Sequence, residues 1–250
     1  MPKNRFAFPA DLGVPLRALE DLIWPRQCAG CGRWDVNLCK DCFHQVTRGS
    51  LSADLEDAEG LPSWPLVALG EYDGPLRDVL LTAKHDSRRD LSVFLHAAGR
   101  RLGALCFPTI ATLPRGSLVR VWIVPAPSSH ERKRRRAEIV PTVARAAATA
   151  LSEALVRGSH PSDPCERPWP LPVRVVDALE LRRGASGTAG KSARRRGQGR
   201  TGSMRLLRSP PGRTAVIILD DVSTTGATLR EMVRLLGPAV LLAAVVAVAP

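Results

Sequence analysis

Aromatic and acidic residues are both scarce in this chain. Phe, Trp and Tyr make up only 4% of its 250 residues, which gives little support for a surface that stacks nucleotide bases on aromatic rings. Lys and Arg total 36 against 24 Asp and Glu, so the net charge is +12. Between Leu181 and Leu219 there are ten Arg or Lys and no acid. This surplus favours polyanionic partners, such as phosphorylated substrates or nucleic acid.

Long apolar runs are missing as well. The apolar stretch at 239–249 is too short to cross a bilayer, so it predicts a core strand, and we expect no membrane insertion. Residues 1–6 lack the apolar segment of a secretion signal, which makes a cytoplasmic location the default. The length suffices for one full core and a small accessory module.

Strand-like and helix-like segments alternate along most of the chain. This alternation predicts an α/β fold with a doubly wound, mainly parallel sheet. Strands are expected at 66–72, 119–124, 173–180, 215–219 and 239–248. Helical spacing of apolar residues predicts helices at about 74–81, 90–105, 137–157 and 229–236.

Composition divides the chain into three parts. Residues 1–48 are expected to form an N-terminal helix and a cysteine-rich module, and the acidic, polar residues 49–65 a linker. Residues 66–250 carry the α/β pattern. Within them, the proline-rich stretch 158–172 and the Arg-, Gly- and Ser-rich stretch 182–213 predict loops.

Four of the six cysteines form two closely spaced pairs, Cys28-x-x-Cys31 and Cys39-x-x-Cys42. Their four thiolates can close a tetrahedral site around Zn²⁺. Because sulfur takes every coordination position, such a zinc would be structural. Two disulfides or four unrelated thiols are the alternatives, and disulfides are disfavoured without a secretion signal. Cys106 has no partner at ligand spacing and is expected in a helix core.

The most informative segment is 216–228, which begins with four branched apolar residues. They predict a strand that is buried on both faces of a parallel sheet and ends at Asp220 and Asp221. A hydroxyl-rich loop and a helix with apolar residues at helical spacing follow. An ordinary buried strand with a Thr-rich helix cap is the plain alternative. Two carboxylates beside a core need a reason, however, because they are costly without partners.

A strand, acidic pair and helix start of this kind can bind a sugar phosphate. Backbone N–H groups and the helix dipole favour a phosphate at the helix N-terminus, and Gly226 permits its close approach. Asp220 and Asp221 can accept hydrogen bonds from adjacent sugar hydroxyls. The side chains that supplement the phosphate contacts are those of Ser223, Thr224, Thr225 and Thr228. Together these groups suit a ribose 5-phosphate.

Segment 216–228 closely resembles the phosphoribosyl pyrophosphate (PRPP) loop of type I phosphoribosyltransferases. Further landmarks occur in order along the chain. They are Leu22-Ile-Trp-Pro25, the two cysteine pairs, Tyr72-Asp-Gly-Pro-Leu-Arg77 followed by Lys84, and Val124-Pro-Ala-Pro-Ser-Ser129 before an Arg cluster. From about residue 22 to 248, the chain therefore resembles the ComF family of competence-associated phosphoribosyltransferase-like proteins.

The resemblance implies a type I phosphoribosyltransferase fold with an N-terminal zinc ribbon, and binding of PRPP together with Mg²⁺. It assigns Asp220 and Asp221 to the ribose hydroxyls and to catalysis. The implied 5-phosphate site comprises Ser223, Thr224, Thr225, Gly226, Ala227 and Thr228. The implied pyrophosphate candidates are Lys84, Pro127, Ser128, Ser129, Arg134 and Arg136. Taken alone, the run 134–136 is equally well explained as a solvated helix start.

Three positions depart from the family pattern. Ala137 follows the Arg run where the family commonly has Gly. Ser186 and Gly199 lie where it has an Asp-Gln segment and an Arg-x-x-Asn element. These family positions help to shape the acceptor pocket, so the resemblance does not identify the acceptor.

The resemblance leaves two functions open. In an enzyme, the C1–O bond of PRPP would break with oxocarbenium character, and the protein would orient the ring and stabilise the departing pyrophosphate. The alternative is a non-catalytic module that handles single-stranded DNA, as the family's link to DNA uptake implies. Its PRPP site would then be vestigial or regulatory.

Overall fold

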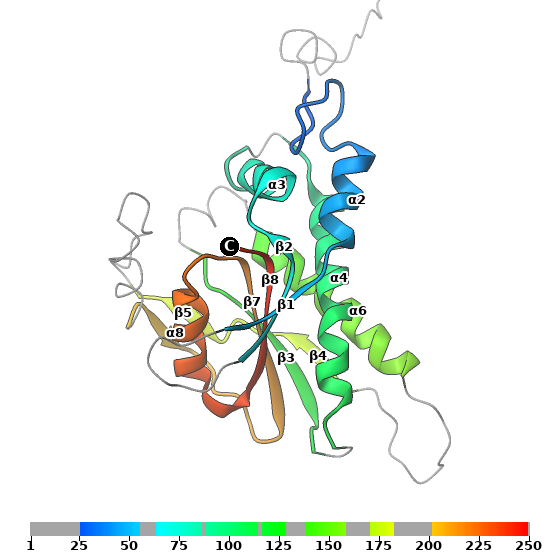
Figure 1. Ribbon diagram of the computed structural model, residues 1–250. Coiled ribbons are helices and arrows are strands. Elements are labelled where there is room, and N and C mark those ends of the chain that lie inside the picture. The colour runs from blue at the N-terminus through cyan, green and yellow to red at the C-terminus, as the bar shows by residue number, and fades with distance from the viewer. Residues whose placement is uncertain are drawn as a thin grey trace, which may run out of the picture.

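The computed structural model describes residues 26–55, 64–86, 89–114, 117–128, 139–158, 171–182 and 202–249. The helix expected before residue 22 lies outside this part of the chain. Figure 1 shows a twisted sheet with helices on both of its faces, which is an α/β architecture.

The sheet has six strands in the order β1-β2-β8-β7-β3-β4. Strand β1 runs antiparallel to β2, and the remaining neighbours are parallel. The predicted mainly parallel sheet is therefore confirmed. The strand bounds are Leu51–Leu55 (β1), Trp64–Glu71 (β2), Arg120–Pro125 (β3), Val173–Val175 (β4), Thr214–Ser223 (β7) and Val240–Val248 (β8).

Helices α3 (Gly74–His85), α4 (Ser92–Ala111) and α6 (Ile139–Arg157) cover one face of the sheet, and α8 (Ala227–Leu236) covers the other. The alternating side chains of β7 divide between these two layers. Ile217 and Leu219 belong to the cluster with α4 and α6, whereas Val216 and Ile218 belong to the cluster with α8. Burial on both faces explains the unbroken apolar run of this strand.

Small residues bring α4 and α6 into close contact. A Cβ added at Gly103 would lie 2.3 Å from the carbonyl oxygen of Ala147, so only glycine fits there. Cys106 lies in the same helix and is buried, as predicted. Burial raises the pKa of its thiol to about 12.

Helix α6 is long and apolar enough to cross a membrane by length and composition alone. Core helices meet the same criteria, and half of its most apolar window is buried against the rest of the protein. This is weak evidence for a membrane span, and the absence of membrane insertion stays a prediction.

Two predicted loops contain strands. The expected linker 49–65 includes β1, whose apolar residues alternate and whose backbone pairs with β2, so the linker prediction is wrong there. The expected loop 182–213 includes β6 (Met204–Leu206), which pairs with β5 (Leu179–Leu181). The strand expected at 173–180 is in fact two, because β4 stays in the main sheet while β5 leaves it. The acidic composition of the first segment and the basic composition of the second predicted loops. Strands form there nevertheless, because backbone hydrogen bonds do not depend on the charge of the side chains.

Candidate functional site

The sheet reverses its direction of winding between β3 and β7. From β3 the chain passes through α6 to β4 on one side, and from β7 it passes through α8 to β8 on the other. In open parallel sheets, ligands bind beyond the carboxyl ends of two such strands. At this edge Pro125 pairs with Leu219, and the half-buried Pro127 and Ser128 follow directly. The acidic pair therefore lies at the expected position of a ligand.

Strand β7 continues beyond its predicted end. Asp220 pairs with Val245 of β8, and Ser223 with Val248, so both carboxylates belong to the strand instead of following it. The prediction that the strand stops before the acids is wrong, because β8 supplies backbone partners whatever the side chains are. Successive side chains of a strand point to opposite faces, so the two carboxylates diverge.

Asp221 lies on the α3 side of the sheet, where it meets Lys84. The Nζ of Lys84 is 2.9 Å from Oδ2 of Asp221, and their side chains are 18% and 9% exposed. Lys84 thus contacts the acidic pair directly. It reaches the end of β7 because α3 passes beside the carboxyl ends of β2 and β8 (Figure 1).

Asp220 is half-buried and follows the alternation of Val216 and Ile218 towards the α8 side. Its Oδ1 accepts a hydrogen bond of 2.8 Å from the backbone N–H of Asp221. The two acids therefore have different surroundings: one is held by an ammonium group, and the other by the backbone of its neighbour.

The loop between β7 and α8 consists of only three residues. Gly226 has a φ of 68°, in the left-handed region that favours glycine, and Ala227 begins the helix. Thr224 and Thr225 are exposed, and Thr228 is half-buried. The N–H groups of the first helical turn have no acceptor within the helix, so they can donate to an anion. Ser223, in contrast, is buried.

The sequence did not single out two side chains of α8 that contact neighbouring segments. The guanidinium of Arg230 donates to the backbone carbonyl of Thr225. Glu231 is 3% exposed, and it accepts hydrogen bonds from Arg234 and from the backbone N–H of Gly202 at 2.8 Å each. Among the described residues, the segment at the start of β6 packs against α8 and contributes to the burial of Glu231.

Several predicted site residues lie outside the described part of the chain. They are the pyrophosphate candidates Ser129, Arg134 and Arg136, and the departing positions Ala137, Ser186 and Gly199. Within the described part, the structure brings Lys84, Pro127 and Ser128 to the same edge as the acidic pair.

The four paired cysteines lie together. One sulfur from each of Cys28, Cys31, Cys39 and Cys42 falls within 4.8 Å of every other, which is a distance at which they could hold a metal ion. The second pair lies at the start of α2 (Lys40–Arg48), with Cys39 as its N-cap. The zinc ribbon that the resemblance implies is therefore not confirmed, and it stays a prediction.

The environment of these sulfurs favours a thiolate at Cys28. Burial raises the pKa of its thiol, but backbone N–H groups of Cys39, Cys31 and Gly30 outweigh this effect and bring the pKa to about 6. Burial and the neighbouring cysteines raise the pKa of the Cys42 thiol. Sulfurs this close cannot all ionise without a cation between them.

The cysteine module packs against α3. A Cβ added at Gly30 would lie 2.9 Å from the sulfur of Cys42 and 3.3 Å from Cβ of Pro75, which is in the first turn of α3. Beyond the other end of that helix, Arg89 donates to the carbonyl of Gln27. The module therefore supports the helix that carries Lys84 to the acidic pair.

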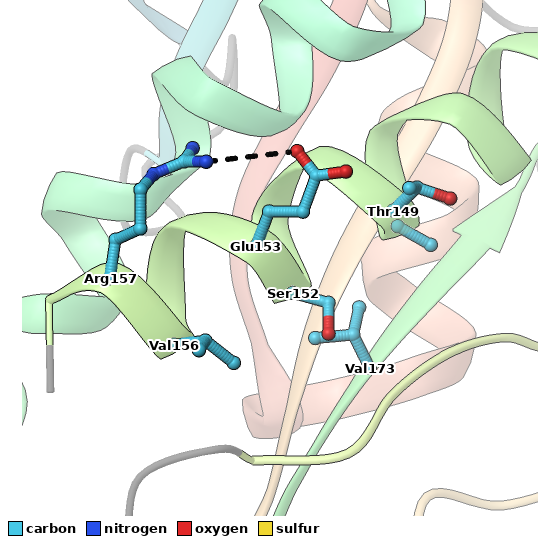
Figure 2. A pocket seen from close by; sticks show the side chains of 7 residues that line it. Thr149, Ser152, Glu153, Val156, Arg157 and Val173 are labelled. Carbon is cyan, nitrogen blue, oxygen red and sulfur yellow. Dashed lines mark ion pairs between the residues drawn. The ribbon is translucent and has the colours of Figure 1, made fainter.

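A shallow hollow lies on the outer surface of α6, next to the first residue of β4 (Figure 2). Its rim includes Glu153, which pairs with Arg157 at 3.9 Å and with Arg100 at 2.7 Å. Because Val173 begins β4, this hollow is at the amino end of the sheet, opposite the acidic pair.

No protein-family model matches the chain, and neither does any curated protein sequence. The inference of function therefore depends on the site itself. That site combines two carboxylates, a half-buried ammonium group and the N-terminus of a helix at one edge of a parallel sheet.

Proposed function

We propose that this protein binds PRPP or another ribose 5-phosphate, and that it is a phosphoribosyltransferase-like protein of the ComF type. One observation carries the proposal: Asp220, Asp221 and the start of α8 meet where the winding of the sheet reverses. The ordered landmarks from residue 22 to 248 support it.

In this proposal the 5-phosphate lies against the N–H groups after Gly226, and the helix dipole adds to their attraction. The ribose hydroxyls donate to Asp220 and Asp221. The pyrophosphate extends towards Pro127 and Ser128 at the end of β3, with Ser129, Arg134 and Arg136 as the further candidates. Mg²⁺ bound with PRPP would neutralise part of the pyrophosphate charge.

The protein's contribution to transfer is positional and electrostatic. The acidic pair orients the ribose ring and stabilises positive charge that develops at C1 as the C1–O bond breaks. Cationic side chains near the leaving group stabilise the released pyrophosphate. An acceptor then attacks C1, and its chemical class is open.

Isothermal titration with PRPP tests this function. Replacing Asp220 and Asp221 together by Asn should abolish measurable binding, because hydrogen bonds to charged groups contribute about 1.5–3 kcal/mol each. Thr225→Ala should weaken binding less, since the backbone donors remain. Glu153→Gln, at the opposite end of the sheet, is the control and should bind normally. Equal affinity in the wild type and the double variant would refute the assignment.

Transfer is tested by Mg²⁺-dependent release of pyrophosphate from PRPP across a panel of bases and nucleic acids. Release that the double Asn variant loses would support an enzyme. Binding of PRPP without release for any acceptor would support a regulatory ligand site instead.

We also propose that Cys28, Cys31, Cys39 and Cys42 hold one structural Zn²⁺. Clustered sulfurs, from three buried cysteines and one exposed one, suit a cation of this type, and one of the thiols has a lowered pKa. Metal analysis should find one zinc per chain, and Cys39→Ser should lose it. Full metal content in that variant would contradict the site. Cys106→Ser is the matched control, because Cys106 lies far from the cluster along the chain and is unpaired.

A second candidate is a binding module for single-stranded DNA. The net charge of +12 and the exposed Trp34, which is 58% accessible on the cysteine module, favour it. A base can stack on such a ring, while cations contact phosphates. Binding should then weaken steeply with salt, and Trp34→Ala should reduce affinity without changing the salt slope. Salt-independent binding would exclude this function.

A further inference from the structure

We propose that Lys84 is an exchangeable counter-ion of Asp221. In the empty site its ammonium group neutralises this carboxylate, and on ligand binding it transfers to an anionic group of the ligand. The site then excludes free divalent cations, and it selects sugar phosphates that carry an anion in addition to the 5-phosphate. The inference deepens the proposed ribose phosphate site and rests on it in part.

The geometry of the pair carries the first step. The ammonium lies 2.9 Å from the Asp221 carboxylate, and the carboxylate is only 9% exposed. A buried carboxylate without a counter-charge is strongly disfavoured, so the ammonium stabilises it in the free protein. A metal ion at the acidic pair would have to displace this ammonium.

The second step concerns what a ligand must do to use Asp221. Sugar hydroxyls that donate to this carboxylate compete with the ammonium of Lys84. A hydroxyl carries no charge, so a ligand that only displaces Lys84 leaves an ammonium group that is 18% exposed without a partner. A second anionic group on the ligand removes that penalty.

The third step is that Lys84 can move while its helix remains fixed. Lys84 is in the last turn of α3, and its four-carbon chain allows the ammonium group to rotate towards a nearby anion. The helix itself is fixed near its start by the contact between Gly30 and Pro75, and beyond its end by Arg89 and Gln27. Only the side chain needs to exchange partners.

Titrations of the full chain with ribose 5-phosphate and with PRPP test the selectivity. The wild type should prefer PRPP by at least about tenfold, equivalent to about 1.4 kcal/mol. Lys84→Met should bring the two affinities close together, while Lys84→Arg should keep the preference. Arg77→Met, which removes an exposed cation from the same helix, should behave as the wild type. If Lys84→Met weakened the binding of ribose 5-phosphate and of PRPP equally, the proposed role of Lys84 in selectivity would be overturned.

Binding of Mn²⁺ alone tests the counter-ion role without any sugar phosphate. The wild type should not bind Mn²⁺ at the acidic pair, whereas Lys84→Met should gain a site that the further change Asp221→Asn removes. No gain in Lys84→Met would overturn the role. If this variant does not fold, Lys84→Gln serves instead, since its amide can still donate to Asp221.

The two failures are distinguishable. Absence of sugar phosphate binding in the wild type refutes the proposed function, and the Mn²⁺ result then decides the counter-ion role by itself. Binding in the wild type with no dependence on Lys84 refutes this inference and leaves the proposed function intact.

Discussion

The charged side chains at the two ends of the parallel sheet differ in their exposure to solvent. At the carboxyl end, Asp221 is 9% exposed and contacts one ammonium group at 2.9 Å. At the amino end, Glu153 borders the hollow of Figure 2 and is 38% exposed. It forms ion pairs with two arginines, Arg100 and Arg157. Both regions have ion pairs and an open surface, yet only one of them encloses a charge.

This difference separates a binding site from an ordinary charged surface. Exposed ion pairs contribute little, because solvent screens them and long side chains lose freedom. An enclosed pair has a desolvation cost that packing alone does not require, so a role in binding is the better explanation. The hollow at the amino end is concave, but nothing in its chemistry sets it apart from other surface.

The largest expected effect comes from breaking the enclosed pair. Lys84→Met leaves Asp221 without a counter-charge and should lower the free energy of unfolding by about 3 kcal/mol, the lower end of the usual range because Lys84 keeps some exposure. Arg100→Met breaks the exposed pair with Glu153 and should change stability little. Urea denaturation of both variants measures the contrast. An equal loss of unfolding free energy in the two variants would show that the ion pairs at the two ends of the sheet contribute equally to stability.

The next effect concerns Glu231, the buried acid on α8. Glu231→Gln removes the negative charge that accepts hydrogen bonds from Arg234 and from the N–H of Gly202. The free energy of unfolding should fall by about 1.5–3 kcal/mol. Amide hydrogen exchange at residues 202–206 should speed up, because this acid ties the start of β6 to the helix. Glu71→Gln, at an exposed strand end, is the control. Unchanged exchange at 202–206 would contradict this anchoring role.

The sequence predicted the parts of the site that are continuous in the chain. The strand, acidic pair, glycine and helix start follow one another within 216–228, and the cysteine pairs within 28–42, so local chemistry is enough to find them. The alternation of elements also predicted the sheet and its layers. Local patterns of this kind depend on spacing, and spacing is visible in a sequence.

The parts that sequence reasoning missed depend on distant segments. The sequence did not predict the ion pair between Lys84 and Asp221, which forms because α3 passes beside the strand ends. The burial of Glu231 also depends on a distant segment, since its carboxylate accepts a hydrogen bond from Gly202, just before β6. Strand β6, which forms a hairpin with β5, was itself expected to lie in a loop, because it is short and lies in a basic stretch.

A smaller effect is expected at the loop before α8. Gly226 has a φ of 68°, and a side chain there costs about 1–2 kcal/mol, so Gly226→Ala should lower stability by that amount. It should also weaken binding of ribose phosphates, since the first-turn N–H groups would shift. Gly212→Ala, where an added Cβ would meet nothing within 4 Å, is the matched control. Thermal denaturation compares the stability of the two variants. An equal change in both would contradict a special requirement for glycine at position 226.

The smallest effect is expected at the other end of β7, and it has the opposite sign. Thr214 is 6% exposed, and its hydroxyl has no hydrogen-bond partner among the described residues. Burying an unpaired hydroxyl is unfavourable, so Thr214→Val should raise the free energy of unfolding by about 1 kcal/mol. Thr149→Val, on the exposed surface of α6, should change it by less than about 0.5 kcal/mol. Binding of PRPP should stay as in the wild type, because Thr214 lies at the amino end of the strand whose carboxyl end forms the site. A destabilised Thr214→Val, or one with altered PRPP affinity, would show that the amino end of β7 does more than support the sheet.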